Sequence, residues 1–385
     1  MKSVILNGPL LTQSGYGVHV RQCARWLLSR TDLDVKFVVT PWGDTPWVLD
    51  ASAYGGLIGE IMKRTVAPDT RSDVSLQLKL PNEWTTEFSR VNVGITAAVE
   101  TDRCNPTWID YCNKMDMIIV PSSHAKNSLT NTGNVTRPLK VIPEAYSDAI
   151  ISKNELTIPD FSTSFNFLVF GQLTGNNPFN DRKNIFHTIK WLSEAFKDDP
   201  DVGIVVKTNI GRNSLIDRSN VKSILASILG EVRKDGKGPK VHLLHGDMSD
   251  EEVAALYKHR QIKSLVTLTR GEGYGLPILE AAASGLPIIA TGWSGHLDFL
   301  NLGKYVSVFY QLGEVHQTRI DDKIFMKGAR WANASEEDFK RRVVKFHDSY
   351  STPKSWAVEL QQKIVKSYSF EEISKAYNAT LSEIV

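Results

Sequence analysis

The chain has 385 residues, of which 42% are hydrophobic and 23% charged, and this length suffices for two or three domains with buried cores. Its 45 Lys and Arg against 43 Asp and Glu leave a net charge of +2, which excludes a protein that holds nucleic acid mainly by bulk charge. The cysteines Cys23, Cys104 and Cys112 lack CxxC spacing, which excludes a disulfide framework or a zinc site and fits a reducing compartment. The first apolar run stops at Gly8 and no run reaches the ~18 residues of a membrane span, so we expect a cytoplasmic protein without an integral membrane segment.

Short apolar runs rich in β-branched residues alternate with longer amphipathic segments along the chain. Strands are expected at 3–6, 35–40, 74–80, 91–97, 117–120, 167–170, 203–207, 241–244, 265–268 and 287–290. Helices are expected at 18–29, 123–132, 184–196, 217–233, 251–259 and 277–284. The apolar runs are continuous rather than alternating, which is typical of parallel strands covered by helices on both faces. The pattern therefore predicts an α/β fold with doubly wound parallel sheets.

The pattern restarts in the second half of the chain. A strand followed by a Gly-containing loop occurs at 5–17 and again at 169–175, and the poorly periodic stretch 142–164 between the halves reads as a linker. We predict an N-terminal domain over 1–150, a second domain over 151–350, and helices over 351–385 that return toward the first domain. The helical tail is expected at 335–349, 353–367 and 370–383.

The most informative stretch is TRGEGYGLPILEAAASGLPIIAT at 269–291. Pro277 suits the first position of a helix and Gly285 suits its end. Free N–H groups at such a helix start, with glycines that allow close approach, predict an anion-binding loop. Glu272 in the loop and Glu280, expected in the first helical turn, have seven residues between them. Carboxylates beside an anion site indicate a ligand that also carries hydroxyls, such as a nucleotide-sugar; the alternative is a helix start whose Glu favours the dipole.

These residues resemble a known motif. Glu272-Gly273-Tyr274-Gly275-Leu276-Pro277, then Glu280-Ala281 and Ser284-Gly285-Leu286-Pro287, are similar to the Glu-x7-Glu signature of glycosyltransferase family 4. Members of this family are retaining enzymes of the GT-B fold, with two Rossmann-like domains around a donor cleft. Weaker resemblance extends over most of the chain, including Pro121-Ser122-Ser123 and Val141-Ile142-Pro143. The resemblance implies a retaining hexosyl- or pentosyltransferase that uses a nucleotide-sugar donor.

The resemblance also implies roles for residues of the second half. Glu280 holds the donor ribose and Glu272 faces the transferred sugar. Backbone contacts to the diphosphate or sugar come from the loop residues Gly273, Tyr274, Gly275 and Leu276. The family usually places an Arg after the first strand of this domain and a Lys about ten residues later. Gln172 stands at the Arg position, Lys183 matches the Lys, and Arg182 is the candidate for the missing guanidinium. The alternative for Arg182 and Lys183 is a solvated helix start.

Candidates in the first half come from its loops. Gln13-Ser14-Gly15-Tyr16-Gly17 resembles the family's loop beside the donor phosphates, which makes Gly15 and Gly17 donor-binding candidates; the alternative is a tight turn. The His that many relatives carry is absent from 98–103, where Glu100 and Asp102 are candidate catalytic contacts to an acceptor hydroxyl. Trp42 and Trp47 follow the second strand and suit either stacking on an acceptor sugar or packing.

Several other classes of site lose support. Asp-x-Asp occurs at 32–34 and 199–201, where a helix gives way to a strand, so both sequences predict turns. The histidines show no metal-ligand spacing, although His296 in the turn after an expected strand is a weak donor-site candidate. Neither GxGxxG nor a Walker A motif occurs, which argues against NAD and ATP. We therefore expect no metal and no cofactor.

Three readings stay open beside a retaining glycosyltransferase. They are a nucleotide-sugar epimerase, a phosphorylase on the same fold, and a non-catalytic nucleotide-sugar-binding protein. The sequence leaves open the donor base and sugar, the linkage and the oligomeric state. It also leaves open whether the acceptor is a glycan, a lipid, a protein, a small molecule or modified DNA.

Overall fold

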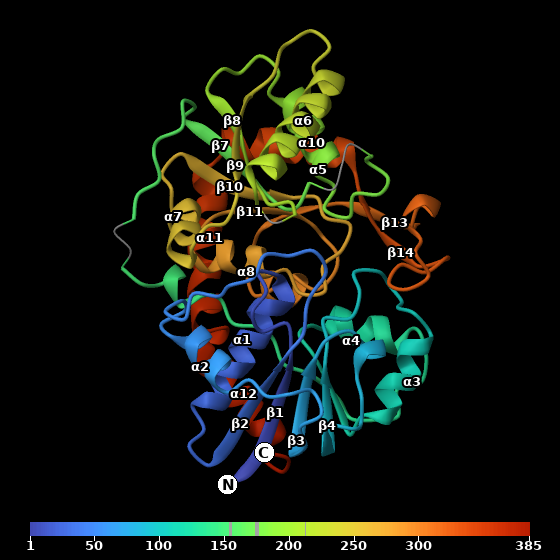
Figure 1. The fold of residues 1–385 in the computed structure, drawn as a ribbon. Helices are drawn as coiled ribbons and strands as arrows, with labels where there is room; N and C mark the ends of the chain where they lie inside the picture. Colours follow the sequence, from blue (N-terminus) through green and yellow to red (C-terminus); the bar gives the residue numbers. More distant parts are fainter. Residues whose placement is uncertain (154–155, 174–176, 212) are drawn as a thin grey trace. The chain divides into compact units, whose positions relative to one another are not determined.

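The computed structural model describes residues 1–153, 156–173, 177–211 and 213–385, which divide into two compact units (Figure 1). The first unit comprises Met1–Ala145, Asp322–Met326 and Phe370–Val385, and the second comprises Tyr146–Asp321 and Lys327–Ser369. The chain therefore leaves the first unit after Ala145. The tail expected to return over 351–385 is divided, because α11 (Ser351–Ser367) belongs to the second unit and α12 (Phe370–Leu381) to the first.

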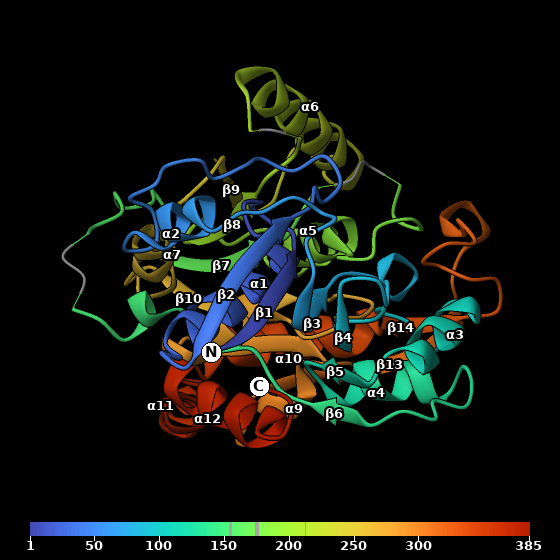
Figure 2. The same cartoon turned by 60° about the horizontal axis from the view of Figure 1, so that its bottom comes forward.

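The first unit is built on a six-stranded parallel sheet. Its strands are β1 (Lys2–Gly8), β2 (Leu33–Val39), β3 (Ser72–Leu78), β4 (Ser89–Ile95), β5 (Met117–Val120) and β6 (Leu139–Val141). They follow one another in the order β2-β1-β3-β4-β5-β6, as Figure 2 shows. The register places Val4 of β1 between Val35 and Val74, so the apolar runs of the three strands lie side by side.

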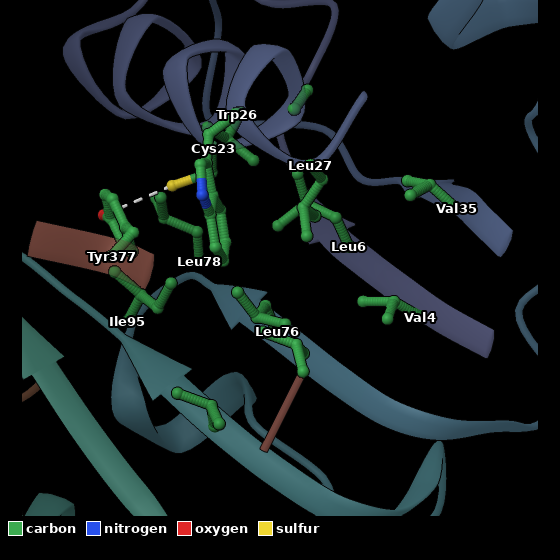
Figure 3. Packing of buried hydrophobic residues seen from close by; sticks show 14 of the residues in the cluster. Val4, Leu6, Cys23, Trp26, Leu27, Val35, Leu76, Leu78, Ile95 and Tyr377 are labelled. Atoms are coloured by element: carbon green, nitrogen blue, oxygen red, sulfur yellow. Dashed lines mark hydrogen bonds between the residues drawn. The ribbon is translucent and has the colours of Figure 1, made fainter. Parts of the chain in front are cut away.

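The main core of the first unit packs α1 (Gly15–Leu28) and α12 against this sheet. Its remaining helices are α2 (Leu57–Lys63), α3 (Thr107–Lys114) and α4 (Ser123–Thr130). Helix α1 (Gly15–Leu28) begins after Ser14, whose hydroxyl accepts a hydrogen bond from the Gly17 N–H at 3.0 Å. Trp26 of α1 stacks on Tyr377 of α12 with ring centroids 4.9 Å apart, and the Cys23 thiol donates to the Tyr377 hydroxyl at 3.4 Å (Figure 3). Burial raises the pKa of the Cys23 thiol to about 12, so this cysteine serves as a core residue.

The second unit is built on another six-stranded parallel sheet, in the order β12-β11-β10-β7-β8-β9. Its strands are β7 (Phe165–Phe170), β8 (Val202–Thr208), β9 (Lys240–His245), β10 (Ile262–Thr267), β11 (Ile288–Thr291) and β12 (Val306–Val308). Its helices, besides α11, are α5 (Ile185–Ala195), α6 (Leu215–Val232), α7 (Asp250–Tyr257), α8 (Leu276–Ala283), α9 (Leu297–Leu300) and α10 (Glu336–Asp348). Along β7, Phe167 and Val169 pack into one core cluster and Leu168 into another, so both faces of the sheet are buried.

A two-stranded antiparallel hairpin, β13 (Tyr310–Glu314) and β14 (Arg330–Ala334), follows the second sheet. Its strands belong to the second unit, whereas the intervening segment Asp322–Met326 belongs to the first. There the Asn105 side-chain amide donates to the carbonyls of Asp322 and Lys323, at 3.2 Å each, and Ile324 packs against a core cluster. The hairpin's connecting segment is thus an integral part of the first unit.

The predicted fold class, two doubly wound parallel sheets with helices, is confirmed. Each expected strand lies at an observed one, and the sequence patterns missed β6, β12, the β13–β14 hairpin and the helices α2, α3 and α9. Among the helices that the structure describes, none combines the length and the hydropathy that a membrane span requires.

Candidate functional site

The winding of the second sheet indicates where a ligand binds in this unit. Strands β7 and β10 are neighbours, and the chain proceeds from β7 to β8 on one side and from β10 to β11 on the other. In open parallel sheets, the crevice at the carboxyl ends of such a pair is the usual binding position. The segments that follow these two strands carry Gln172, after β7, and Glu272, after β10. The candidate site is therefore assembled at this edge.

Glu272 is held firmly within the loop between β10 and α8. Its backbone N–H donates to the Ser294 hydroxyl at 2.9 Å, and its carbonyl accepts from the Gly295 N–H at 3.0 Å. A Cβ on Gly295 would lie 2.3 Å from the carbonyl oxygen of Gly273, so only glycine permits this close approach of the two loops. The Glu272 residue is 7% exposed. Two loops that follow adjacent strands thus fix the position of this carboxylate.

Two cations from the loop before α5 neutralise Glu272. The Lys183 ammonium lies 2.7 Å from one carboxylate oxygen, and the Arg182 guanidinium lies 3.2 Å from the other. The same guanidinium nitrogen donates to the Gly271 carbonyl at 2.9 Å. Burial alone would raise the pKa of Glu272, but the charges of Lys183 and Arg182 outweigh it and hold that pKa at about 2. Glu272 is consequently ionised at neutral pH, and the structure brings these three predicted residues together.

The loop that carries the two cations has an unusual local conformation. Asn184, which precedes α5, has φ of 55°, a left-handed conformation that Asn tolerates better than most residues. The carboxylate of Asp181 accepts a hydrogen bond from the Ile185 N–H at 2.5 Å, which satisfies a donor at the start of α5. Burial raises the pKa of Asp181, and backbone N–H groups at the helix start oppose this shift. The sequence analysis missed both Asp181 and Asn184 as site-forming residues.

Helix α8 begins at Leu276, one residue earlier than expected, with Pro277 in its second position. Gly275 precedes it with φ of 100°, a conformation that requires glycine here. The Tyr274 residue is 3% exposed, and its ring packs against Phe299 with centroids 5.5 Å apart. The backbone contacts expected from this loop stay a prediction.

The position expected for Glu280, the first turn of α8, is wrong. The helix begins at Leu276 and has about 3.6 residues per turn, so Glu280 lies in its second turn. Its carboxylate accepts a hydrogen bond from the Ser147 backbone N–H, beside Asp250 at the start of α7. Burial, together with the charge of Asp250, raises the pKa of Glu280 to about 8. The two glutamates of the motif therefore occupy opposite electrostatic environments.

The other candidates of the second unit fall around this site. Gln172 is exposed directly after β7, and residues 174–176, which include the Gly175 of the expected loop, lie outside the described residues. His296 is fully buried, with its Nε2 2.8 Å from the Thr291 carbonyl and its Nδ1 3.4 Å from the Ser294 hydroxyl. His296 thus contacts Ser294, whose hydroxyl in turn accepts the hydrogen bond from the Glu272 N–H.

In the first unit, the loop after β1 packs against the loop after β2. The Tyr16 ring stacks on Trp42 with centroids 4.0 Å apart, and its hydroxyl lies 3.0 Å from the Thr96 hydroxyl. A Cβ on Gly17 would lie 2.1 Å from the Thr12 carbonyl oxygen, whereas one on Gly15 would meet nothing within 4 Å. Gly17 is thus required by packing, and Gly15 is an open position at the start of α1.

The remaining acceptor candidates of the first unit lie near these loops or beyond them. Trp42 is half-buried by its stacking, whereas Trp47 is 46% exposed. Glu100, partly buried after β4, lies near enough to Tyr16 that its charge contributes to raising the Tyr16 pKa, which burial mainly raises. Asp102 pairs with Arg103 at 4.0 Å. These four residues stay candidates for acceptor contacts.

The Asp-x-Asp sequence at 199–201 lies at the turn before β8, as expected, whereas the one at 32–34 runs from a turn into β2, which contains Asp34. Asp32 is bound by its neighbour Arg30, and the Asp199 carboxylate accepts from the Asp201 N–H at 3.0 Å. Within the described ranges, no group of three or more His, Cys, Asp or Glu side chains is placed to hold a metal ion.

Comparison with known proteins finds a family match over the part of the chain that contains the two glutamates of the motif. Residues 226–349 match the family model of glycosyl transferases group 1, and this range contains both Glu272 and Glu280. A probable sucrose-phosphate synthase of Thermosipho melanesiensis is 26% identical over 200 residues, which are 51% of this chain and 37% of that protein. The chain thus spans little more than a third of the length of this relative.

The solved structures show the same fold at low identity. Sucrose-phosphate synthase of Thermosynechococcus elongatus has a TM-score of 0.65 and 12% identity, covering 100% of this chain and 99% of that one. Anabaena HepE, in complex with UDP and glucose, has a TM-score of 0.61 and 12% identity with complete coverage of both chains. The class of the fold is therefore GT-B, with two Rossmann-like domains, as predicted.

Proposed function

We propose that this chain is a retaining glycosyltransferase that moves a hexosyl or pentosyl group from a nucleoside diphosphate-sugar to a hydroxyl acceptor. The observation that carries the proposal is the buried Glu272 carboxylate, held by Lys183 and Arg182 at the switch point of the second sheet. Two cations close to a helix start suit a diphosphate, and a carboxylate between them suits the hydroxyls of a sugar. Anabaena HepE, which shares the fold, binds UDP and glucose, so UDP-glucose is the first donor to test.

The reaction replaces one bond to the anomeric carbon by another. As the bond to the diphosphate breaks, negative charge develops on the leaving group, where Lys183, Arg182 and the N–H groups at the start of α8 stabilise it. Glu272 stabilises the positive charge that develops on the sugar. The acceptor oxygen bonds to the same face of the anomeric carbon and gives its proton to a diphosphate oxygen. The configuration is thereby retained, and neither a separate base nor a metal ion is required.

The remaining residues receive supporting roles in this proposal. Glu280 binds the donor ribose, and the backbone of the loop 273–276 contacts the diphosphate or the sugar. Because the pKa of Glu280 is about 8 without a donor, its carboxyl is mostly protonated at neutral pH and can both donate and accept hydrogen bonds to the ribose hydroxyls. Glu100, Asp102, Trp42 and Trp47 are proposed to contact the acceptor.

Two variants separate binding from chemistry. Glu280→Ala removes a contact that is the same in the ground and transition states, so we expect donor Kd to rise ~10-fold or more with little change in kcat. Alanine is used because Gln would imitate the protonated carboxyl. Glu272→Gln removes a contact that strengthens as the sugar becomes cationic, so we expect kcat to fall ~100-fold while donor Kd changes less than ~3-fold.

The measurements are donor Kd by calorimetry and kcat from the release of nucleoside diphosphate. Glu194→Gln is the matched control, since Glu194 also pairs with lysines, Lys190 and Lys340, but lies on the outer surface of α5. Equal losses of affinity in both variants with unchanged kcat, or no change in either, would show that this loop does not hold a nucleotide-sugar. Inversion of the anomeric configuration in the product would contradict the retaining mechanism.

A further inference from the structure

Arg270 lies two residues before Glu272, and the sequence gives it no role. It is only 7% exposed, although its charge favours solvent. Its guanidinium donates to the carbonyl oxygens of Asp181, at 3.3 Å, and of Pro178, at 3.1 Å. Its backbone N–H donates to the carbonyl of Arg182 at 2.8 Å. Arg270 thus makes three hydrogen bonds to the loop that presents Arg182 and Lys183.

Strand β14 fixes the same guanidinium from its other side. The Asn333 side-chain oxygen accepts a hydrogen bond from it, and the guanidinium carbon lies 5.3 Å from the centre of the Trp331 ring. The Arg270 carbonyl accepts from the Ala332 N–H at 2.9 Å. A planar group with five donors can satisfy partners on two separate segments at once, which an ammonium cannot do in the same geometry. The side chain therefore joins the cation-bearing loop to the hairpin.

We infer that Arg270 is a positioning residue, which sets the distance between the Lys183 and Arg182 cations and the Glu272 carboxylate. The inference rests on the proposed function, since it assigns Arg270 to the same donor site. Arg270 itself has its guanidinium donors directed to protein carbonyls and Asn333, so it acts through the loop. Displacing a catalytic group by about 1 Å can cost ~100-fold in rate, so loss of this brace is expected to reduce catalysis.

Coupling between substitutions tests this inference. We expect Arg270→Gln to lower kcat/KM by ~10- to 100-fold in the otherwise unaltered chain, mainly through kcat. In a chain that already carries Arg182→Ala and Lys183→Ala, the same substitution should cost less than ~3-fold, because the groups that it positions are gone. Arg270→Lys keeps the positive charge but loses the planar guanidinium and its five donors, so its activity should be little higher than that of Arg270→Gln. Arg233→Gln is the control, because Arg233 also donates to carbonyl and hydroxyl oxygens, at Pro239 and at Ser193 near the C-terminal end of α5.

Each result bears on one statement. If Arg270→Gln lowers kcat/KM by the same factor in the unaltered chain and in the chain with Arg182→Ala and Lys183→Ala, the inference is overturned. The glycosyltransferase proposal would then be unaffected. No turnover by the unaltered chain with any nucleotide-sugar would instead contradict the proposed function. Amide hydrogen exchange of peptides covering 177–184, measured without a donor, then tests whether Arg270 holds the loop that carries Arg182 and Lys183. We expect Arg270→Gln to accelerate exchange there by ~10-fold or more, with exchange in β7 and β10 unchanged, and unaltered exchange over 177–184 would overturn the inference.

Discussion

Replacing Lys183 by alanine tests the chemistry of the site most directly. The ammonium lies 2.7 Å from Glu272 and its side chain is 22% exposed, so it stands at the border between the buried carboxylate and solvent. In the proposed reaction it also stabilises the leaving diphosphate. Removing one such charge-stabilising contact costs ~100- to 1,000-fold in kcat, equivalent to about 2.7–4 kcal/mol. We expect a loss of this size in kcat/KM for Lys183→Ala.

The substitution also changes the protonation of Glu272. With Lys183 gone, the charge of Arg182 and the hydrogen bond with Thr269 remain to offset burial, so the pKa of Glu272 rises from about 2. A carboxyl with a lowered pKa in the folded state contributes stability above its unfolded pKa of about 4.5, and this stability is lost as the pH falls toward 2. Lys183→Ala should therefore be less stable than the unaltered chain at pH 7, and the difference should shrink below pH 4.

The assay is steady-state release of nucleoside diphosphate, with unfolding by urea at pH 7 and pH 3.5. Lys190→Ala is the matched control, since Lys190 lies on α5 and pairs with Glu194 at 3.9 Å on the surface, an arrangement worth at most about 1 kcal/mol. Activity of Lys183→Ala within ~3-fold of the unaltered chain, or an equal loss in Lys190→Ala, would refute the reasoning. Lys183 would then be a solvated residue before a helix.

Three further outcomes follow from the structure. Because the pKa of Glu280 is raised in the folded state, the folded state loses stability as the pH rises from 4.5 to 8. Glu280→Gln should therefore raise Tm at pH 8.5 and have little effect at pH 4.5. Each unit by which the pKa is raised corresponds to about 1.4 kcal/mol of unfolding free energy, or roughly 2–4 °C in Tm. An unchanged Tm difference across this range would exclude the raised pKa. Trp42→Ala should destabilise the first unit by more than about 1 kcal/mol in urea unfolding because it removes the stack on Tyr16, whereas Trp47→Ala should stay within about 0.5 kcal/mol. Equal effects would place both rings in the same environment. Donor turnover should persist in excess EDTA, and its loss with recovery on Mn²⁺ would contradict a reaction that relies on Lys183 and Arg182.

The sheets could be predicted because burial on both faces leaves a clear pattern. Strands such as β5, with the sequence MIIV, and β7, which ends in FLVF, contain continuous apolar runs. The short edge strands β6 and β12 have three residues each, too few for a pattern to stand out. The β13–β14 hairpin was missed because its residues are mainly polar or exposed. An antiparallel hairpin also falls outside the alternation of strands and helices from which the other strands were predicted.

The site was predicted in part for a similar reason. Glu272 and Lys183 could be singled out because their motifs are local, and the structure then brings them together across 89 positions of the chain. Arg270 gives no such signal, since its partners at Pro178 and Asn333 lie 92 and 63 positions away and two of its contacts involve only backbone carbonyls. Every residue has a backbone carbonyl, so the residue type does not show which carbonyl accepts a hydrogen bond from Arg270. Glu280 was predicted in the first turn of α8 and lies in the second, because the helix begins one residue earlier than expected. Helix starts are uncertain by one or two residues.

The opposite environments of the two glutamates give the proposed donor site a definite charge balance. At neutral pH Glu272 carries its charge against Lys183 and Arg182, and Glu280 is mostly protonated, so these four groups sum to about +1. A diphosphate carries more negative charge than this and competes with Glu272 for both cations. As the cations turn toward the phosphate, burial weighs more heavily on Glu272 and its pKa rises. A carboxylate that has lost part of its counter-charge is stabilised by any cation that forms beside it. In the proposed reaction the departure of the diphosphate leaves such a cation on the sugar, so the binding of the leaving group would itself prepare Glu272 to stabilise the transition state.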